Sequence, residues 1–176
     1  MTYFFTADEH YNHKNIIKYC NRPFESIEEM NTTIVERHNE IVGYSDLVIH
    51  AGDFTLDKDW KIAQMFYKRL NGRHIFLKGS HDYWLNSRYG REYNPGEIWE
   101  RTVNGVYIVI CHYAMRVWAR SHYNSWMLYG HSHGTLEPIG KQHDVGVDNN
   151  NFYPVSFEQL KTIMANRPDN PNLVKR

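Results

Sequence analysis

The stretch YFFTADEH at residues 3–10 decides how the chain begins to fold. Its apolar run 3–6 predicts a short buried strand, and three polar residues, Asp8, Glu9 and His10, follow where that strand ends. The same pattern returns at 47–53, which ends in Gly52-Asp53, and at 74–82, which ends in Gly79-Ser80-His81-Asp82. Because the carboxyl ends of strands in an α/β sheet open onto one crevice, we expect these three turns to meet in space.

Helical patterns separate these strands. Ser26 opens a capping box that predicts a helix over about 26–42, and Asp57 is expected to cap a second helix that runs through Leu70. The second half is richer in strands, because Asn104-Gly105 is a strong turn signal between two apolar segments. Strands are expected there at 98–103, 106–110, 126–129 and about 142–147, and a last helix at 156–164.

These elements predict an α/β fold, a two-sheet β-sandwich flanked by helices. Residues 1–165 are expected to form a single domain. The segment 166–176 contains two prolines and no apolar cluster, so we expect a loosely ordered tail.

The composition narrows the classes of function. Twenty basic residues balance twenty acidic ones in 176 residues, so the chain lacks the net positive charge that holds nucleic acid. With neither an 18-residue apolar stretch nor a basic leader, we expect a protein without a membrane segment. Two cysteines, Cys20 and Cys111, form no disulfide framework, which favours reduced thiols and a cytoplasmic location.

The eleven histidines are the unusual feature of the composition. Several lie beside Asp or Gly at predicted strand ends, and in Asp8-x-His10 and His131-x-His133 the two side chains point to the same side of an extended backbone. Imidazole and carboxylate ligands suit Mn, Fe, Zn or Ni better than metals that prefer thiolates. The candidate metal ligands on this reasoning are Asp8, His10, Asp53, His112, His131 and His133.

These motifs, in this order, resemble the calcineurin-like metallophosphoesterase superfamily. Its pattern is Asp-x-His, Gly-Asp, Gly-Asn-His-Asp/Glu, a single His and Gly-His-x-His, and the chain matches it from Asp8 to His133. The short length is most similar to the small phosphoesterases of bacteria and phages. The resemblance implies a four-layer αββα sandwich.

The resemblance also implies a dinuclear metal site, with manganese as the first choice of ion. The first ion would be held by Asp8, His10, Asp53 and His133. Asp53 would bridge to the second ion, whose other ligands would be Ser80, His112 and His131. Such a pair of cations clamps a phosphoryl group and lowers the pKa of a bridging water to supply hydroxide.

Three neighbouring positions receive further roles from the resemblance. His81 would stabilise charge or protonate the leaving oxygen, and Asp82 would accept a hydrogen bond from His81 and fix its tautomer. Ser80 departs from the family pattern, which has Asn here. A serine hydroxyl is shorter and a poorer neutral donor than an amide oxygen, so we expect weaker binding of the second ion.

Other polar residues admit two interpretations. Arg116 could bind phosphate and Trp118 could stack on a base, or both could pack at the rim. His38, His50 and His74 are interpreted as core histidines, and Asp148 as a structural residue. The sequence does not decide whether three further histidines line the site or lie on the surface, namely His13, His122 and His143.

The expected function is therefore a metal-dependent phosphoesterase, and preferably a phosphodiesterase acting on a small phosphorylated or nucleotide substrate. One alternative is a nuclease of the same superfamily, which the neutral charge disfavours. The other is a non-catalytic metal-binding scaffold, which His81 disfavours because a scaffold needs no acid for a leaving group. The sequence does not indicate an oligomeric state.

Overall fold

The computed structural model describes residues 1–174, which contain two four-stranded sheets. In the first sheet β1 (Tyr3–Thr6), β2 (Leu47–His50) and β3 (Arg73–Phe76) are parallel, and β8 (Val155–Ser156) runs antiparallel beside β1. In the second sheet β5 (Val106–Cys111), β6 (Trp126–Tyr129) and β7 (Gln142–Asp144) are parallel, and β4 (Ile98–Val103) forms the expected hairpin with β5.

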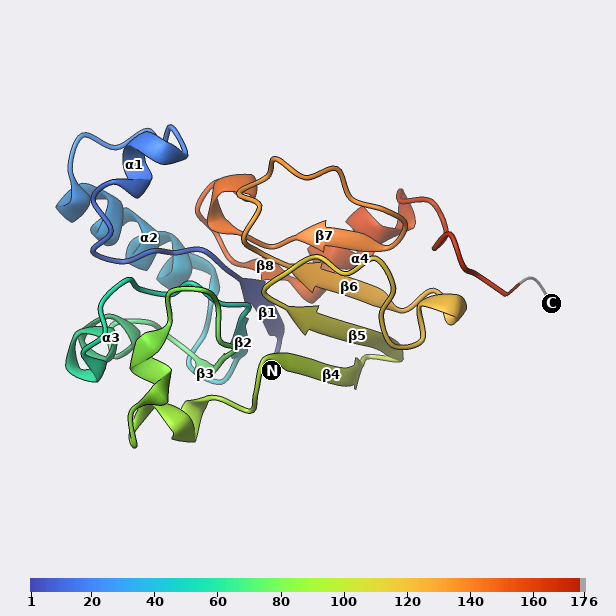
Figure 1. Ribbon diagram of the computed structural model, residues 1–176, viewed down its shortest axis with the longest axis horizontal. Helices are drawn as coiled ribbons and strands as arrows, with labels where there is room; N and C mark the ends of the chain where they lie inside the picture. The colour runs from blue at the N-terminus through green and yellow to red at the C-terminus, as the bar shows by residue number, and fades with distance from the viewer. Residues whose placement is uncertain (175–176) are drawn as a thin grey trace.

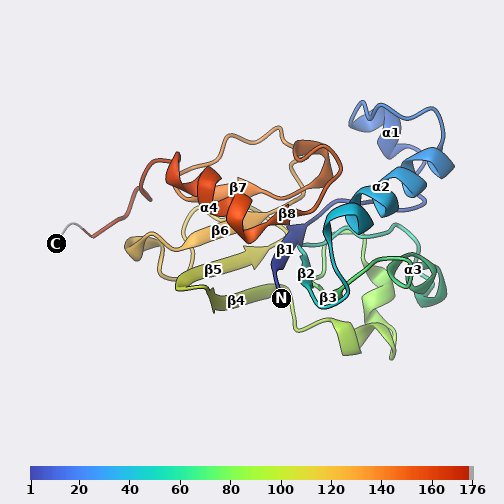
Figure 2. The same ribbon diagram turned by 180° about the vertical axis from the view of Figure 1, so that it is seen from behind.

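The helices flank these sheets. Figure 1 shows α1, α2 and α3 gathered around the first sheet, and Figure 2 shows α4 lying over β6, β7 and β8 from behind. The predicted sandwich of two sheets flanked by helices is thus confirmed. The bounds are α1 (Ile16–Tyr19), α2 (Ile27–Ile41), α3 (Trp60–Tyr67) and α4 (Phe157–Ala165), with short 3₁₀ turns at Tyr83–Asn86, Gly90–Tyr93, Ser121–Tyr123 and Val147–Asn149.

One helix start differs from the prediction. α3 begins at Trp60 because the side chain of Asp59, and not that of Asp57, accepts a hydrogen bond from a first-turn amide, that of Lys61. Asp57 instead accepts a hydrogen bond from the side chain of Asn12.

The core between the two sheets comes from alternate residues of their strands. Phe5 and Ile49 of the first sheet and Ile108 and Leu128 of the second are fully buried in one cluster, which Leu160 of α4 joins. Alternation along β5 and β6 sends Val109 and Met127 to the opposite face. Burial of the inner face of each sheet fixes the strand register, and so the positions at which the strands end.

The C-terminal segment is anchored, contrary to the expectation of a loose tail. Asn170 is 2% exposed, and its side chain donates hydrogen bonds to the carbonyls of Ser121 and Ser125. The amide of Val174 donates to the carbonyl of His122, while residues 175–176 lie outside the described part. In residues 1–174 no helix is long and apolar enough to cross a membrane.

Candidate metal centre

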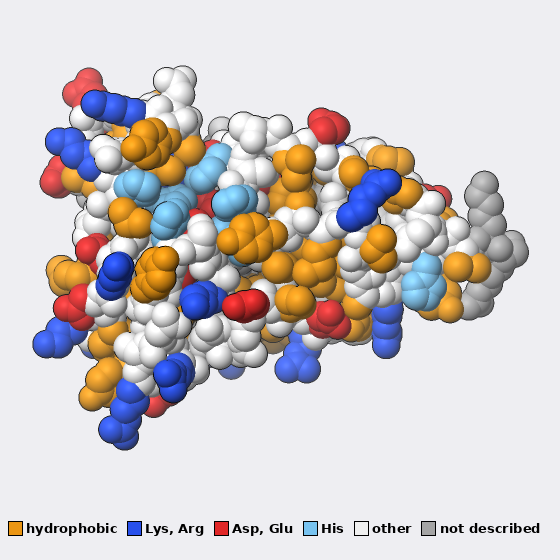
Figure 3. Space-filling model, viewed as in Figure 1, with side chains coloured by type: hydrophobic (Ala, Val, Ile, Leu, Met, Phe, Trp, Pro, Cys, Tyr) orange, Lys and Arg blue, Asp and Glu red, His pale blue; other side chains and the backbone are white. Residues whose placement is uncertain are grey.

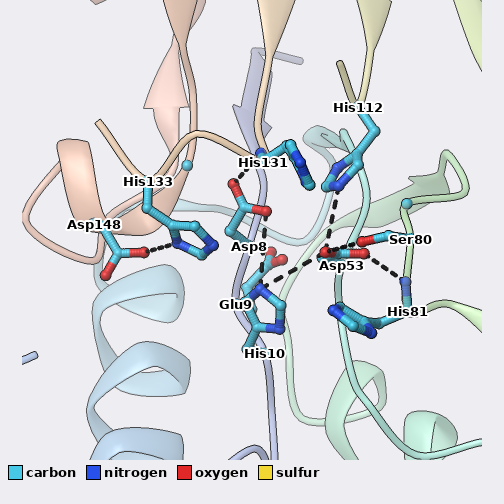
Figure 4. Close-up of polar contacts among 12 residues, drawn as sticks. Asp8, Glu9, His10, Asp53, Ser80, His81, His112, His131, His133 and Asp148 are labelled. Atoms are coloured by element: carbon cyan, nitrogen blue, oxygen red, sulfur yellow. Dashed lines mark hydrogen bonds and ion pairs between the residues drawn. The ribbon is translucent and has the colours of Figure 1, made fainter. Parts of the chain in front are cut away.

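Five strands deliver polar side chains to one place. Residues just beyond the carboxyl ends of β1, β2, β3, β5 and β6 converge in the centre of the molecule, and Figure 4 shows their side chains pointing toward one another. Among residues 1–174, three groups have ligand atoms that all lie within 4.8 Å of one another. Two consist of candidate ligands, namely Asp8 with His10 and His133 (the first group) and Asp53 with His112 and His131 (the second group), and the third joins Cys20 to His133 and Asp148. The structure therefore brings together all six candidate ligands taken from the sequence.

The backbone at these positions is left-handed, which corrects the extended backbone expected for Asp8-x-His10 and His131-x-His133. Asp8, His10, Asp53, His131 and His133 have φ values of 59°, 53°, 57°, 67° and 48°. Non-glycine residues adopt this conformation rarely, and it turns the chain sharply enough to present the side chain at the end of a strand. Gly130 permits the close approach of two such turns, because a Cβ there would lie 2.7 Å from Oδ2 of Asp8.

In the first group, Asp8 has one oxygen engaged and one free. Oδ2 accepts a hydrogen bond of 2.8 Å from the amide of His131, whereas Oδ1 is buried without a hydrogen-bond partner among the described residues. Burial, together with the nearby Asp144 and Asp53, raises the pKa of Asp8 well above its ordinary value. A divalent cation would supply the positive charge that this carboxylate lacks.

His10 and His133 are held in forms that can bind metal. Burial lowers the pKa of His10 well below its ordinary value, so the ring is neutral, and its Nε2 has no hydrogen-bond partner in the described chain. Nδ1 of His133 lies 2.7 Å from Oδ2 of Asp148. The carboxylate accepts this hydrogen bond, which leaves Nε2 of His133 free for an ion.

Arg22 supports both sides of this group and was not singled out in the sequence. Its fully buried guanidinium donates two hydrogen bonds of 2.7 Å to Asp148, and two more to the carbonyls of Asp8 and Glu9. Asp148 therefore fixes a ligand in addition to its expected structural role. No local signal reveals Arg22, because its partner lies 126 residues away in the chain.

Asp53 belongs to the second group and also faces the first. Its Oδ2 is 3.3 Å from Nε2 of His112 and 3.8 Å from Nε2 of His10, and its Oδ1 accepts a hydrogen bond from the amide of His81. Although burial favours the neutral acid, His112 and the His81 amide hold the pKa of Asp53 well below its ordinary value. Asp53 is thus an anion placed to contact an ion in either group.

The second group has a similarly oriented ring in His112. Its Nδ1 donates a hydrogen bond to the carbonyl of Ala51 at 3.0 Å. The lone pair of its buried Nε2, which faces Asp53, is therefore free to bind an ion. Ser80 lies on the same side, and its hydroxyl donates to Oδ2 of Asp53 at 2.9 Å. His131 is exposed, and partial burial and the adjacent His112 lower its pKa.

Among the described residues no hydrogen bond joins the carboxylate of Asp82 to the ring of His81, which corrects the role expected for Asp82. Its buried carboxylate accepts hydrogen bonds from the amides of Gly79, Asp53 and Phe54 and from the indole of Trp84. Burial raises the pKa of Asp82 to about 6. Asp82 therefore holds together the turns after β2 and β3, and His81 keeps its position without it.

Arg116 and Trp118 lie away from the centre. Trp118 is buried on the outer face of the second sheet against Met127, and its indole donates to the carbonyl of Ser125 at 3.1 Å. Arg116 is exposed, and neither residue lines the cavity at the metal ligands. The proposed substrate contacts are therefore corrected: the apolar ring of Trp118 is needed to cover the sheet.

A second polar network leads away from the centre through Glu9. Oε1 of Glu9 lies 2.7 Å from Nδ1 of His50, whose Nε2 lies 3.0 Å from Nδ1 of His74. Burial raises the pKa of Glu9 to about 7 and lowers that of His50 to about 3. His38, His50 and His74 pack around the buried strands as expected.

The three histidines that the sequence could not assign to the site or to the surface, namely His13, His122 and His143, have different environments in the structure. His13 lines the cavity beside His10, with ring centroids 5.4 Å apart, while His122 is exposed. His143 is buried, and its Nε2 lies 3.2 Å from the side-chain oxygen of Asn150. Only His13 belongs to the surroundings of the site.

The donor set fits divalent cations. Buried Oδ1 of Asp8 and Nε2 of His10 and His112 have no hydrogen-bond partner in residues 1–174, although unpaired buried polar atoms are costly. All three face the space between the groups, with carboxylates that need positive charge. Nitrogen and oxygen donors in this mixture suit first-row transition metals.

Comparisons with known proteins agree with this geometry. A sequence model described as calcineurin-like phosphoesterase matches residues 1–172. The chain is 33% identical over 162 residues to the uncharacterized protein MJ1445 of Methanocaldococcus jannaschii, covering 88% of this chain and 86% of that protein. The crystal structure of AQ665 from Aquifex aeolicus, a protein of unknown function, superposes with a TM-score of 0.69 at 21% identity and covers 92% of this chain and 98% of that one. The last likeness concerns the fold.

Proposed function

The chain belongs to the calcineurin-like phosphoesterase family, a family of metal-dependent phosphoesterases, and we propose that it is a phosphodiesterase with a dinuclear centre that prefers manganese. The position of Asp53 carries the proposal, because its Oδ2 lies 3.3 Å from Nε2 of His112 in its own group and 3.8 Å from Nε2 of His10 in the other group. Small phosphorylated molecules are the proposed substrates, and the cytoplasm is the proposed location.

Two cations at these groups would supply Lewis acidity and hold the phosphoryl oxygens. The protein's own contribution is to hold the ligands rigidly, since the orienting contacts of His112 and His133 are already formed. His81 adds a further ring, whose centroid lies 5.6 Å from that of His10. We propose that His81 donates a proton to the leaving oxygen.

The surroundings favour a diester over a monoester. A diester carries one negative charge and a monoester close to two, so a monoester gains more from neighbouring Lys and Arg side chains. Within residues 1–174 neither Lys nor Arg lines the cavity of about 1030 Å³ at the ligands, and a single lysine, Lys78, lines the smaller hollow beside Ser80. Figure 3 shows the pale blue histidines in a hollow open to solvent, which leaves room for a second ester group.

The test compares two substrates that share one leaving group. Metal-free protein is reconstituted separately with Mn²⁺, Fe²⁺, Zn²⁺ and Ni²⁺, and kcat/KM is measured for bis(4-nitrophenyl) phosphate and for 4-nitrophenyl phosphate. We expect activity only with metal, highest with Mn²⁺, and a larger kcat/KM for the diester. Undiminished activity in the metal-free protein would refute metal dependence, and a preference for the monoester would refute the substrate class.

A matched pair of variants tests the dinuclear arrangement. Asp53→Asn should lower metal content and activity together, because the shared carboxylate is lost. Asp59→Asn makes the same chemical change at an exposed helix cap and should leave both unchanged. Normal metal content with normal turnover in Asp53→Asn would contradict a bridging role.

A further inference from the structure

The cavity at the metal centre is much larger than a phosphate group requires. Its volume of about 1030 Å³ is at the upper end of the range for sites that enclose drug-sized ligands. Its floor includes His10, Asp53, His131 and His133, so any group that fills the remainder must extend from a phosphoryl group at the ions.

The wall beyond the ligands is apolar. Ile16 and Tyr19 of α1, Leu56 after β2 and Leu136 after β6 line it, although they are far apart in the sequence. Leu56 is 39% exposed and Leu136 is 47% exposed, which is unfavourable for leucine side chains in water. Figure 3 shows orange side chains bordering the pale blue histidines.

A second, smaller hollow adjoins the centre and contains charged side chains. Its volume is about 270 Å³, and its lining includes Lys78 and Glu97 beside Tyr83 and Tyr113. Ser80 lines both spaces, so they meet at the second group of ligands. A phosphodiester at the ions therefore has unlike surroundings for its two ester groups.

His81 lines the large cavity and does not line the small hollow. An acid at that position is placed on the side of whichever ester group occupies the large cavity. The protein therefore distinguishes the two ester oxygens of a phosphodiester, because only the ester oxygen nearest His81 can be protonated as it leaves.

Resting on the proposed phosphodiesterase function, we propose that the wall of Ile16, Tyr19, Leu56 and Leu136 binds an apolar or aromatic ester group and that this group leaves. Water forms a new P–O bond and releases a proton to solvent, the P–O bond to the apolar group breaks, and the leaving oxygen takes a proton from His81, which regains one from solvent. The products are an apolar alcohol or phenol and a monoester that keeps the smaller group.

Internal competition tests the orientation. The probe is 4-butylphenyl phenyl phosphate, whose two leaving groups have similar acidity but differ in apolar size. We expect 4-butylphenol to be released in excess over phenol, by about fifteenfold if two of the four added carbons become buried. The product ratio does not depend on how much enzyme is folded or loaded with metal. Equal release, or an excess of phenol, would overturn the proposal.

Matched variants locate the preference. The double variant Leu56→Glu and Leu136→Glu should bring the product ratio close to one. Ile139→Glu is the control, because Ile139 is 39% exposed, as Leu56 is, and lies outside the cavity. A ratio that is unchanged in the double variant would overturn the assignment of this wall.

A binding measurement keeps this inference separate from the proposed function. Calorimetry of the metal-loaded protein with ethyl and butyl methylphosphonate, which resist cleavage, should show tighter binding of the butyl compound in the wild type and equal binding in the double variant. If no diester is cleaved but this difference is present, the proposed function fails and the apolar subsite stands. If diesters are cleaved without the difference, only the subsite fails.

Discussion

Oδ2 of Asp148 accepts a hydrogen bond of 2.7 Å from Nδ1 of His133, and the same carboxylate is held by the buried guanidinium of Arg22. His133 and Arg22 together hold the pKa of Asp148 below its ordinary value in spite of burial. The orientation of His133, and so the direction in which Nε2 points, depends on this anion.

Asp148→Ala should weaken binding of the ion at Asp8, His10 and His133 by about 10–100-fold, the usual effect of losing a partner of a ligating histidine. Calorimetric metal titration measures the change. Arg22→Met is the companion variant. It removes the guanidinium that pairs with Asp148 and leaves that carboxylate with His133 alone, so it should lower the free energy of unfolding, measured in urea, by about 3–5 kcal/mol. Unchanged metal affinity in Asp148→Ala would show that His133 is oriented without it.

His81→Ala should keep the metal content and slow cleavage by roughly 10²–10⁴-fold if His81 is the general acid. The loss should grow as the leaving group becomes poorer, because nitrophenolate needs little protonation and phenolate needs more. Rates for a series of aryl methyl phosphates measure this dependence. His13→Ala removes another imidazole from the same cavity and should retain the wild-type dependence. An equal loss across the series would assign His81 to positioning.

Ser80→Asn should tighten the weaker ion. The Ser80 hydroxyl is engaged as a donor to Asp53 at 2.9 Å, whereas an asparagine side chain is longer and offers an amide oxygen. In the wild type we expect unequal affinities for two ions and activity that rises with added Mn²⁺. Titration calorimetry of wild type, Ser80→Asn and Ser80→Ala checks both expectations. Two equally tight sites in the wild type would contradict the first.

The buried histidines should make the fold sensitive to mild acid. Burial lowers the pKa of His38 from 6.5 to about 4, so between these values the unfolded chain binds a proton that the folded chain does not. Its contribution to stability is complete above pH 6.5 and is lost as the pH falls toward 4, by about 1.4 kcal/mol per pH unit. His38→Gln retains a donor for the Asn71 carbonyl and should flatten this slope in urea unfolding of metal-free protein.

The control for this measurement is His122→Gln, since His122 is exposed. It removes a titrating imidazole without removing a buried one, and its slope should match that of the wild type. If His38→Gln also has the wild-type slope, the acid sensitivity arises elsewhere, for instance from His50 or His74.

The strand ends and their ligands could be predicted because the signal is local. An apolar run followed by Asp or His, as at residues 3–10, predicts both a strand and the polar side chains at its end. The rules of parallel sheets then bring the ends together. The same reasoning applies to His112, which follows β5 immediately, and to Asp53, which lies three residues after the end of β2.

Contacts over long sequence separations could not be predicted in this way. Arg22 meets Asp148 only after the two sheets have packed, and Asn170 meets Ser121 only once the C-terminal segment crosses the second sheet. Asp82 was misassigned for a related reason. Adjacency to His81 suggested a partner, but three backbone amides brought together by folding took its hydrogen bonds.

The left-handed backbones of five ligand residues lower the stability of the folded chain, and this loss is tied to the geometry of the site. Each such conformation costs roughly 1 kcal/mol or more for a residue with a Cβ, and glycine would relieve it. That cost is already present in the folded protein, so binding of an ion does not require these turns to change conformation. An ion of unsuitable radius therefore gains no better fit from such a change. A homologue that no longer needed catalysis could replace these aspartates and histidines with glycine. Side chains at such costly positions therefore indicate a fold that is retained for its function.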